Sequence, residues 1–544
     1  MTQISRRNFL KASAVSVGGI AASAMLSACG GASNSDSSSK KKILRFGLAN
    51  AKQPIDMQRS NSSLSASIAD SICESLLRWN EENKLEPVLL TEVPRFESDG
   101  VTLNCTLKEG VKFHNGAVLT ANDVKYTFER MFKPETGAKS TYMYDSIVGA
   151  EEMLKGEAQE LKGLVVKDDT HFSFTLKKPF SAFVCNLGIS YGHIFPHEAC
   201  EAAGMNWGQG TNLIGTGRYK LTANDDTTEV VLERFDDHHL GKPNLDEIHY
   251  KYFDDANTKL LAFKNGDIDF CDLDPQSVVQ YSQDPEVRDL IHEYETLGVH
   301  FVNLNLAENQ GLTDVRVREA LSIAINRQEI VDSIASGKAI PASGWLAPQT
   351  PGSLHELPAI EYNPDKARAL LAEAGVSDLK LVAKVRNGLA QKQAVAVQDY
   401  WAKVGVTLDV QVEDAGVWMK DWSDGSLQIT ALGWYPLYAD GDNHMYSYFY
   451  SKSAKKKSSF YNNPEVDADF DRARASQDAA ERADLYKKID SKLTREDYAT
   501  IPLYWPKGTF VCKDYVKNAK VGNLIYHTYE IDIDTTKSDY NPES

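Results

Sequence analysis

Hydrophobic and polar positions follow two periods along the chain, and the balance between them changes near residue 300. Before that point most apolar segments are short and alternate like half-buried strands, as at 43–49, 101–107 and 248–253. After it, longer segments with helical spacing dominate, as at 314–336 and 390–404. This pattern predicts an α/β fold with two zones that meet near residue 300 and again near residue 500.

Several predicted elements carry signals at their ends. Thr120-Ala-Asn-Asp123 is a capping-box pattern and predicts a helix start. Asn363-Pro364 predicts another helix start, and Gly375 predicts the end of that helix. Apolar spacing predicts a helix over 67–79 and a strand over 501–505.

Residues 431–450 contain seven large aromatic side chains. Gly433, Pro436 and Gly441 interrupt the segment, so neither a helical nor a strand period continues across its first half. Aromatic rings on irregular backbone face either a domain core or a concave pocket. Composition alone leaves both interpretations open.

Length and charge narrow the possible partners. A chain of 544 residues exceeds what one hydrophobic core supports, so two or three domains are expected. The formal charge is −17, and residues 1–42 carry six Lys or Arg and one Asp, which leaves −22 for residues 43–544. This charge argues against nucleic acid and against an anionic membrane surface as partners.

The first 42 residues have the pattern of an export signal followed by a lipid anchor. Arg6 and Arg7, followed by Phe-Leu-Lys, match the twin-arginine motif. A weakly apolar run then ends in Leu-Ser-Ala before Cys29, the pattern that precedes a lipid-modified cysteine. We therefore expect a signal peptide over 1–28, a lipid on Cys29 and a flexible Gly/Ser tether over 29–42.

Two motifs suggest other chemistries. Gly188-Ile-Ser190-Tyr-Gly192 matches the G-x-S-x-G pattern of a serine nucleophile, but Pro196 is incompatible with the helix that must follow. His193, His197 and Cys200 have the spacing of a three-ligand metal site on a helix, which the same proline interrupts. The seven cysteines include no C-x-x-C pair, and without Cys29 the other six could pair in fifteen ways.

A series of motifs runs in order through the chain. They are Leu107-Lys-Glu-Gly-Val-Lys-Phe113, His114-Asn-Gly116, Leu119-Thr-Ala121, Asp123-Val124, Tyr126-Thr-Phe128-Glu-Arg130, Gly215-Thr-Gly217-Arg-Tyr219, Pro243-Asn-Leu245-Asp-Glu-Ile248, Phe263-Lys-Asn-Gly266-Asp-Ile-Asp269, Asp314-Val-Arg316-Val-Arg318-Glu-Ala-Leu321, Ala324-Ile-Asn326-Arg327, Tyr362-Asn-Pro364 and Gly433-Trp434. The set resembles the extracellular solute-binding proteins of family 5, the peptide- and nickel-binding lipoproteins of ABC importers. It covers nearly all of the chain after the tether.

The resemblance implies a two-lobed periplasmic-binding-protein clamshell of type II. The first lobe would comprise residues 43–300, completed by residues 502–544, with an inserted subdomain at about 78–195. The second lobe would comprise residues 301–501. Ligands of such proteins lie between the lobes, so the aromatic segment would line a pocket. The G-x-S-x-G segment would lie in the subdomain, away from that pocket, and His238-His239 in a solvated surface turn.

The resemblance also identifies candidate ligand-binding residues. Peptide-binding members place an Asp four residues after the glycine of the Gly433-Trp434 pair, where it receives the α-ammonium group of the ligand. Here that position is Leu437, so either Asp440 replaces the missing charge or the ligand lacks a free amino terminus. The remaining candidates are aromatic pocket walls, an arginine for a carboxylate and two asparagines for ligand backbone: Trp434, Tyr435, Trp418, Trp345, Arg386, Asn303 and Asn305.

These observations together predict a lipid-anchored, extracytoplasmic binding protein. We expect a monomer without a cofactor that captures a peptide or peptide-like solute between its lobes and delivers it to an ABC permease. A non-peptide ligand, such as a metal chelate or haem, is the alternative. A serine hydrolase is a third possibility, and catalysis is not expected.

Overall fold

A computed structural model describes residues 40–308, 311–522 and 525–542. Arg6, Arg7 and Cys29, the predicted export signal and lipid site, lie outside these residues. Within the described ranges no helix is both long and apolar enough to span a bilayer. The described residues from Lys41 onward form one compact unit.

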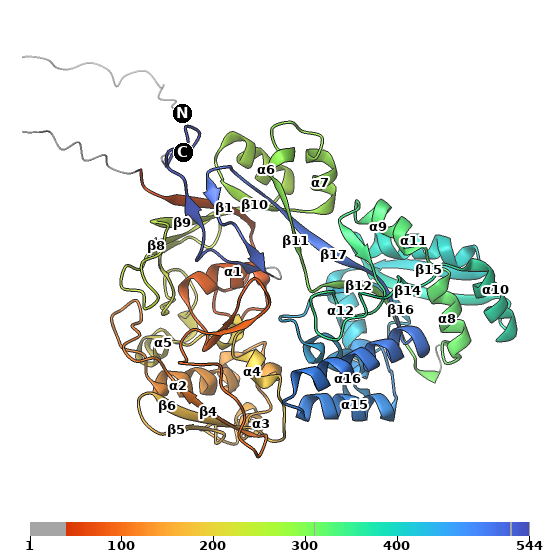
Figure 1. The fold of residues 1–544 in the computed structure, drawn as a ribbon, viewed down its shortest axis with the longest axis horizontal. Helices are drawn as coiled ribbons and strands as arrows, with labels where there is room; N and C mark the ends of the chain where they lie inside the picture. The colour runs from red at the N-terminus through yellow and green to blue at the C-terminus, as the bar shows by residue number, and fades with distance from the viewer. Residues whose placement is uncertain (1–39, 309–310, 523–524, 543–544) are drawn as a thin grey trace, which may run out of the picture. The chain divides into compact units, whose positions relative to one another are not determined.

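One 12-stranded sheet runs through this unit (Figure 1). Along its main path the neighbouring strands are β15 (Val406–Glu413), β14 (Leu379–Arg386), β16 (Ile429–Trp434), β12 (Val299–Leu304), β17 (Thr500–Cys512), β10 (Phe270–Leu273), β1 (Ile43–Ala49), β9 (Glu247–Phe253), β8 (Glu229–Arg234) and β7 (Tyr219–Asn224). Beside that path, β11 (Ile291–Glu295) and β13 (Ala339–Pro341) pair with β17. β1 is buried over almost its whole length because it lies between the parallel strands β9 and β10.

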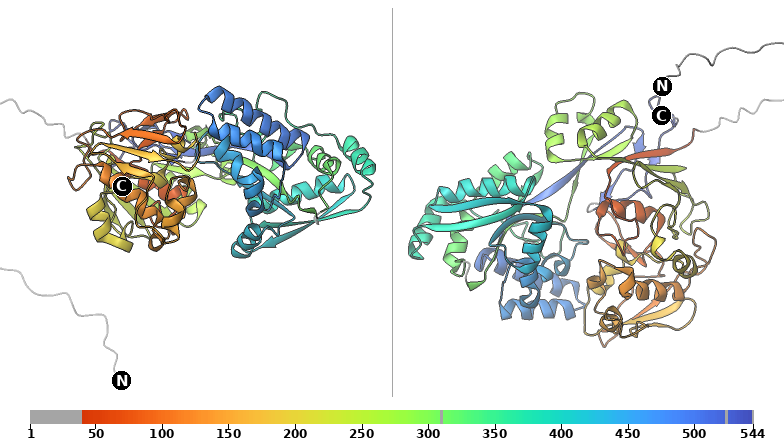
Figure 2. Two further views of the ribbon diagram at one scale, coloured as in Figure 1. Left: turned by 90° about the horizontal axis from the view of Figure 1, so that it is seen from below. Right: turned by 180° about the vertical axis from the view of Figure 1, so that it is seen from behind.

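β17 joins the two halves of this sheet. Its residues 500–504 pair with β12, whereas residues 509–512 pair with β10. β11 runs beside residues 507–511 of the same strand, and both cross between the halves (Figures 1 and 2). We call the half built on β1 and β7–β10 the first lobe and the half built on β12 and β14–β16 the second lobe. The residue limits predicted above for the lobes and the subdomain stay predictions.

The first lobe has a core on the sheet, another beside it, and a smaller one that includes Phe263. Phe46, Tyr250 and Phe270 lie in the core on the sheet, and Phe128 and Phe174 lie in the other. The elements of this lobe outside the large sheet are α1 (Ser63–Ile72), β2 (Leu77–Trp79), β3 (Leu85–Pro87), β4 (Thr102–Thr106), α2 (Ala121–Phe132), α3 (Ala150–Leu154), β5 (Leu164–Val166), β6 (His171–Thr175), α4 (Phe183–Asn186), α5 (His197–Ala203), α6 (Ala256–Asn265), α7 (Pro275–Tyr281), β18 (Val516–Lys517), β19 (Val521–Gly522), β20 (Ile525–Tyr526) and β21 (Asp532–Ile533).

The second lobe packs helices against the other half of the sheet. Its cores include Trp401, packed with helices and strands at the β14–β15 end, and Trp345, packed among other aromatic rings. Its helices are α8 (Val315–Ile323), α9 (Arg327–Ile334), α10 (Pro364–Glu373), α11 (Leu389–Ala402), α12 (Ala415–Asp424), α13 (Ser447–Phe449), α14 (Ser451–Ala454), α15 (Pro464–Ala475) and α16 (Ala479–Ser491).

The predictions with a strong local signal are confirmed. Thr120 is the N-cap of α2 and forms a capping box with Asp123. Asn363 caps α10 through a hydrogen bond from the backbone N–H of Lys366, and Gly375 follows the last turn with φ of 71°. The predicted strand at 101–107 is β4.

Three predictions about elements are wrong. The helix predicted over 314–336 is two helices, because Asn326 starts a new one by accepting a hydrogen bond from Glu329. The helix predicted over 67–79 ends at Ile72, whose carbonyl accepts from Gly217 instead of from the next helical turn. Residues 431–434, predicted to be irregular, continue β16.

The six described cysteines are free thiols, so none of the fifteen pairings is present among them. All but Cys185 are buried.

Candidate functional site

A cavity of about 930 Å³ lies between the two lobes. The first lobe contributes the end of α1 and β2, the segments 142–146 and 186–193, and Arg218. The second lobe contributes residues 434–438, 442–443 and 446–447. The C-terminal residues 527–529 complete the wall, and the sequence offered no signal for their role.

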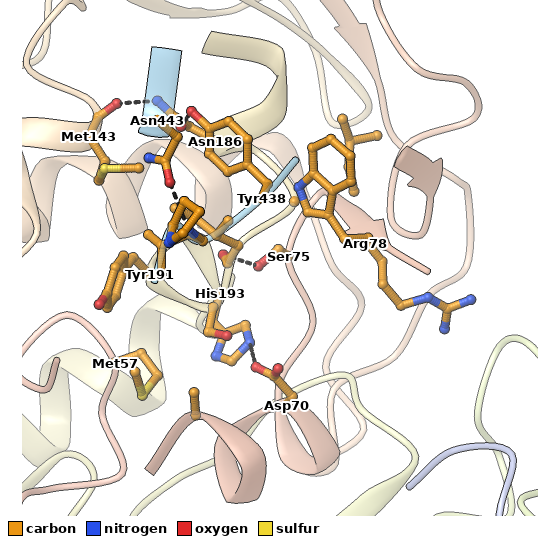
Figure 3. A pocket seen from close by; sticks show the side chains of 18 of the residues that line it. Met57, Asp70, Ser75, Arg78, Met143, Asn186, Tyr191, His193, Tyr438 and Asn443 are labelled. Atoms are coloured by element: carbon orange, nitrogen blue, oxygen red, sulfur yellow. Dashed lines mark hydrogen bonds and ion pairs between the residues drawn. The ribbon is translucent and has the colours of Figure 1, made fainter. Parts of the chain in front are cut away.

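On the first-lobe side a contact between His193 and Asp70 stands at the cavity wall. Nε2 of His193 lies 2.9 Å from Oδ1 of Asp70, which α1 presents (Figure 3). Nearby, the Ser75 hydroxyl donates to the carbonyl of Ile189 at 2.7 Å. These contacts hold the 186–193 segment against α1 and give this wall a polar character.

On the second-lobe side, Trp434 and Tyr435 line the cavity, as predicted for the aromatic segment. The end of β16 packs closely: a Cβ atom at Gly433 would lie 2.8 Å from the His300 ring, and one at Gly298 would lie 2.4 Å from the Tyr435 ring. Glycine is therefore required at both positions for Tyr435 to keep its place. Nε1 of Trp434 is buried without a hydrogen-bond partner among the described residues.

His300 fixes the Tyr435 hydroxyl. Nε2 of Gln393 donates to Nδ1 of His300 at 2.9 Å, so the neutral ring carries its proton on Nε2 and donates it to Tyr435 Oη at 3.1 Å. Burial lowers the pKa of His300 to about 4, which keeps this tautomer at neutral pH.

Tyr438 extends from the second lobe into the first. Its ring stacks on Trp79 with centroids 5.5 Å apart and planes 1° apart. Its hydroxyl donates to Oδ1 of Asn186 at 2.7 Å (Figure 3). The side chain is 2% exposed and belongs to the core around Phe128, so it is a direct contact between the lobes.

The acidic residues after Leu437 have different surroundings. Leu437 itself lines the cavity and packs against the core around Phe128. Asp440 does not line it: its carboxylate accepts from Arg482 at 2.5 Å and from the backbone of Asp442. Asp442 does line the cavity, is 8% exposed, and has Oδ1 without a hydrogen-bond partner among the described residues. Burial raises the pKa of Asp442, although Arg474, 3.2 Å away, opposes this.

The other predicted site residues lie within the second lobe, outside the cavity lining. Trp345 is fully buried, and its Nε1 donates to the carbonyl of His444. Asn303 donates to carbonyls at 457 and 458, and Asn305 donates to carbonyls at 425 and 427, so both tie segments of their own lobe together. The Arg386 guanidinium carbon lies 4.9 Å from the centre of the Trp418 ring, and neither residue lines the cavity.

The G-x-S-x-G segment lies elsewhere than predicted. Residues 188–193 line the cavity instead of lying away from it. Ser190 begins a single 3-10 turn that ends at Gly192, so the strand and helix that expose a serine nucleophile are not built around it. His193 pairs with Asp70, whereas Cys200 is buried in the first-lobe core, so these two do not form a ligand face.

His238 and His239 are not solvated as predicted, because both contact Glu74 at 3.1 and 2.9 Å. The backbone N–H of Leu240 donates to Nδ1 of His238, so Nε2 of the neutral ring carries the proton and donates it to Glu74. Although burial opposes it, these hydrogen bonds hold the pKa of Glu74 well below its ordinary value. The trio is a hydrogen-bond network, since a metal would need the His238 lone pair that the proton occupies.

Comparison with known proteins gives consistent matches. Residues 84–456 match the bacterial extracellular solute-binding proteins, family 5. The glutathione-binding protein GsiB of Pectobacterium atrosepticum is 30% identical over 453 residues, which are 81% of this chain and 84% of that protein. The dipeptide-binding protein of Escherichia coli is 27% identical over 424 residues, 73% of this chain and 77% of that protein.

The fold is shared with solved periplasmic binding proteins. DppA from Helicobacter pylori, in complex with the peptide STSA, matches with a TM-score of 0.75 at 22% identity, covering 90% of this chain and 98% of that one. The unliganded open form of the murein tripeptide-binding protein MppA matches with a TM-score of 0.78 at 20% identity, covering 91% and 98%. These matches confirm the predicted two-lobed α/β fold. The relatives are binding proteins, not enzymes, and the chain belongs to the family 5 bacterial extracellular solute-binding proteins.

Proposed function

We propose that this protein is the lipid-anchored binding component of an ABC importer, and that it captures a peptide or peptide-like solute between its lobes. The cavity is the observation that carries this proposal, because both lobes line it and its volume fits a short peptide. Closure of the lobes around the ligand would create the state that the permease accepts. The curated relatives named above, which bind glutathione or dipeptides, support this class of ligand.

Trp434, Tyr435 and Leu437 are the predicted residues that we propose to contact the ligand. The rings of Trp434 and Tyr435 offer flat walls, and Nε1 of Trp434, which has no hydrogen-bond partner among the described residues, offers a donor. Asp440 is bonded to Arg482 and does not line the cavity, so we propose Asp442, which lines it beside Arg474, as the acid that receives a ligand ammonium group. Its carboxylate is desolvated, and Oδ1 lies 3.2 Å from Nε of Arg474 without a hydrogen bond, so a ligand ammonium group would share this carboxylate with Arg474.

Native mass spectrometry of the purified chain, before and after denaturation, tests the ligand class. We expect several co-purified masses that belong to short peptides and leave on denaturation. A single non-peptide mass, such as haem or a metal chelate, would show that the alternative is correct. If no ligand co-purifies, we would titrate the protein with trialanine and with glutathione in a calorimeter instead. Failure of both peptides to bind would contradict the proposal.

The ammonium site has its own test. We expect trialanine to bind at least tenfold more tightly than N-acetyl-trialanine, and Asp442→Asn to remove this preference. Asp484→Asn, an exposed change on α16, is the matched control and should keep it. A preference that survives Asp442→Asn would exclude Asp442 as the anchor.

The proposed attachment to the membrane depends on Cys29, and we propose that the released protein is a monomer. Cys29→Ser should move the protein from the membrane fraction to the soluble fraction of the cell. Retention in the membrane fraction would contradict lipidation. Light scattering of the released protein should give the mass of one chain.

A further inference from the structure

Arg218 is a cation at the cavity wall whose backbone is held in place on both sides. The N–H of Gly217 donates to the carbonyl of Ile72 at 2.9 Å, and the N–H of Phe235 donates to the carbonyl of Arg218 at 2.8 Å. The next residue, Tyr219, is fully buried at the start of β7. The half-buried Arg218 side chain, by contrast, makes no hydrogen bond or ion pair within the described part of the chain.

A second guanidinium and an aromatic ring stand beside it. The Arg218 guanidinium carbon lies 5.8 Å from the centre of the Tyr529 ring, and that of Arg78 lies 4.2 Å from the same centre. All three residues line the cavity. The Tyr529 hydroxyl and Nε of Arg78 are buried without a hydrogen-bond partner among the described residues. In Figure 3 the Arg78 side chain extends away from Tyr438 and Asn186.

The acids near these cations are already engaged. Glu74 accepts hydrogen bonds from His238, His239 and the Thr216 hydroxyl. Glu86 accepts from Arg78 at 3.1 Å and from the side-chain amide of Asn80 at 2.7 Å.

The donors of Arg218 therefore remain free for a group that enters the cavity. Burial lowers the pKa of Arg218, with Glu74 opposing and Arg78 adding to the effect. A desolvated cation of this kind gains most from an anion with two oxygens in one plane.

We propose that Arg218, supported by Arg78 and Tyr529, forms a subsite for a carboxylate group of the ligand. Arg218 would bind the carboxylate in a forked pair, and the Tyr529 hydroxyl would donate a further hydrogen bond. The carboxylate is either the C-terminus of a peptide or an acidic side chain. This inference rests on the proposed function and adds to it the charge that the ligand carries at one end.

Isothermal titration calorimetry with matched probes tests the subsite. The probes are trialanine, trialanine amide, and Ala-Glu-Ala amide, whose only carboxylate is on the side chain. We expect the unmodified protein to bind one of the two carboxylate-bearing probes roughly 10- to 100-fold more tightly than trialanine amide. Which probe it prefers identifies the source of the carboxylate.

Arg218→Gln should abolish that preference without weakening the binding of trialanine amide. Arg218→Lys keeps the positive charge but not the forked geometry, so it should retain part of the preference for the carboxylate-bearing probe. Arg368→Gln, an exposed change on α10, is the matched control and should behave like the unmodified protein. Thermal unfolding of each variant shows whether it is folded, and Arg218→Lys carries the test if Arg218→Gln is not.

Two results would overturn the subsite and leave the proposed function intact. One is equal affinity of the unmodified protein for all three probes, and the other is a full preference that persists in Arg218→Gln. If none of the probes binds and native mass spectrometry finds no peptide, the proposed function fails and the subsite fails with it.

Discussion

Tyr438→Phe should weaken ligand binding by removing one hydrogen bond between the lobes. The Tyr438 hydroxyl donates to Oδ1 of Asn186, and the orientation of that amide is fixed because its Nδ2 donates to the carbonyl of Met143 at 2.6 Å. The substitution keeps the ring that stacks on Trp79 and leaves Oδ1 of Asn186 buried without this donor. An unsatisfied buried acceptor costs about 1–3 kcal/mol.

The effect on affinity follows from where that hydrogen bond exists. If it forms only when the lobes are closed, its loss weakens closure, and therefore binding, by the same free energy. This corresponds to a roughly 5- to 150-fold increase in Kd. Titration calorimetry with trialanine measures the change, and thermal unfolding in the absence of ligand measures any loss of fold stability.

Tyr461→Phe provides the matched control. Tyr461 is likewise a buried residue and its hydroxyl donates to Asp497 at 2.6 Å, but both residues belong to the second lobe. This variant should lower the unfolding temperature and leave trialanine affinity unchanged. If Tyr438→Phe also lowers only the unfolding temperature and leaves affinity unchanged, the Tyr438 hydrogen bond stabilises the fold without contributing to lobe closure. That result would refute the reasoning about closure.

Three other predictions concern the second lobe. Gly298→Ala places a methyl group against Tyr435 and should weaken trialanine binding at least fivefold, as measured by calorimetry. Unchanged affinity would show that Tyr435 can move without loss of binding. Asp440→Asn leaves the buried Arg482 without its carboxylate and should lower the free energy of unfolding, measured in urea, by about 3 kcal/mol. A loss below about 1 kcal/mol would mean that the contacts of Arg482 with a carbonyl and a hydroxyl are enough to stabilise its charge. His300 has a folded pKa of about 4, below its unfolded value, so its stabilising contribution is complete above pH 6.5 and is lost as the pH falls toward 4, by up to about 3 kcal/mol. Urea unfolding between pH 7 and 4 should show a shallower loss for His300→Gln than for the unmodified protein, and identical slopes would contradict this assignment.

The parts of the fold that could be predicted have causes within a few residues. Thr120 and Asp123 satisfy the first turn of α2 by themselves, so their pattern is visible in the sequence. The end of α1 at Ile72 depends instead on a hydrogen bond from Gly217, more than a hundred residues away. Local periodicity contains no record of such a contact, so the predicted helix continued too far.

The same limit applies to the candidate site. The aromatic segment was identified, but its rings divide: Trp434 and Tyr435 line the cavity, whereas Phe449 is buried in the second-lobe core. Whether each of these rings points into the cavity or into the core depends on where β16 ends, and the sequence did not reveal that position. Arg218 and Tyr529 lie more than three hundred residues apart, and no pattern in the sequence connects them.

The charges around the cavity give a physical reason why a ligand with two opposite charges would close the lobes. Asp442 belongs to the second lobe and Arg218 to the first, and both line the cavity. Oδ1 of Asp442 has Arg474 3.2 Å away but accepts no hydrogen bond from a described residue, and the Arg218 side chain makes no hydrogen bond or ion pair with one. A ligand with one charge would engage only one lobe and would add little to the difference in free energy between open and closed states. A zwitterion would engage both, so each charge gains its full interaction only when the lobes are closed. Under the proposed function, Asp442 takes the role of the acid that Leu437 replaces, and the ligand still needs two charged ends.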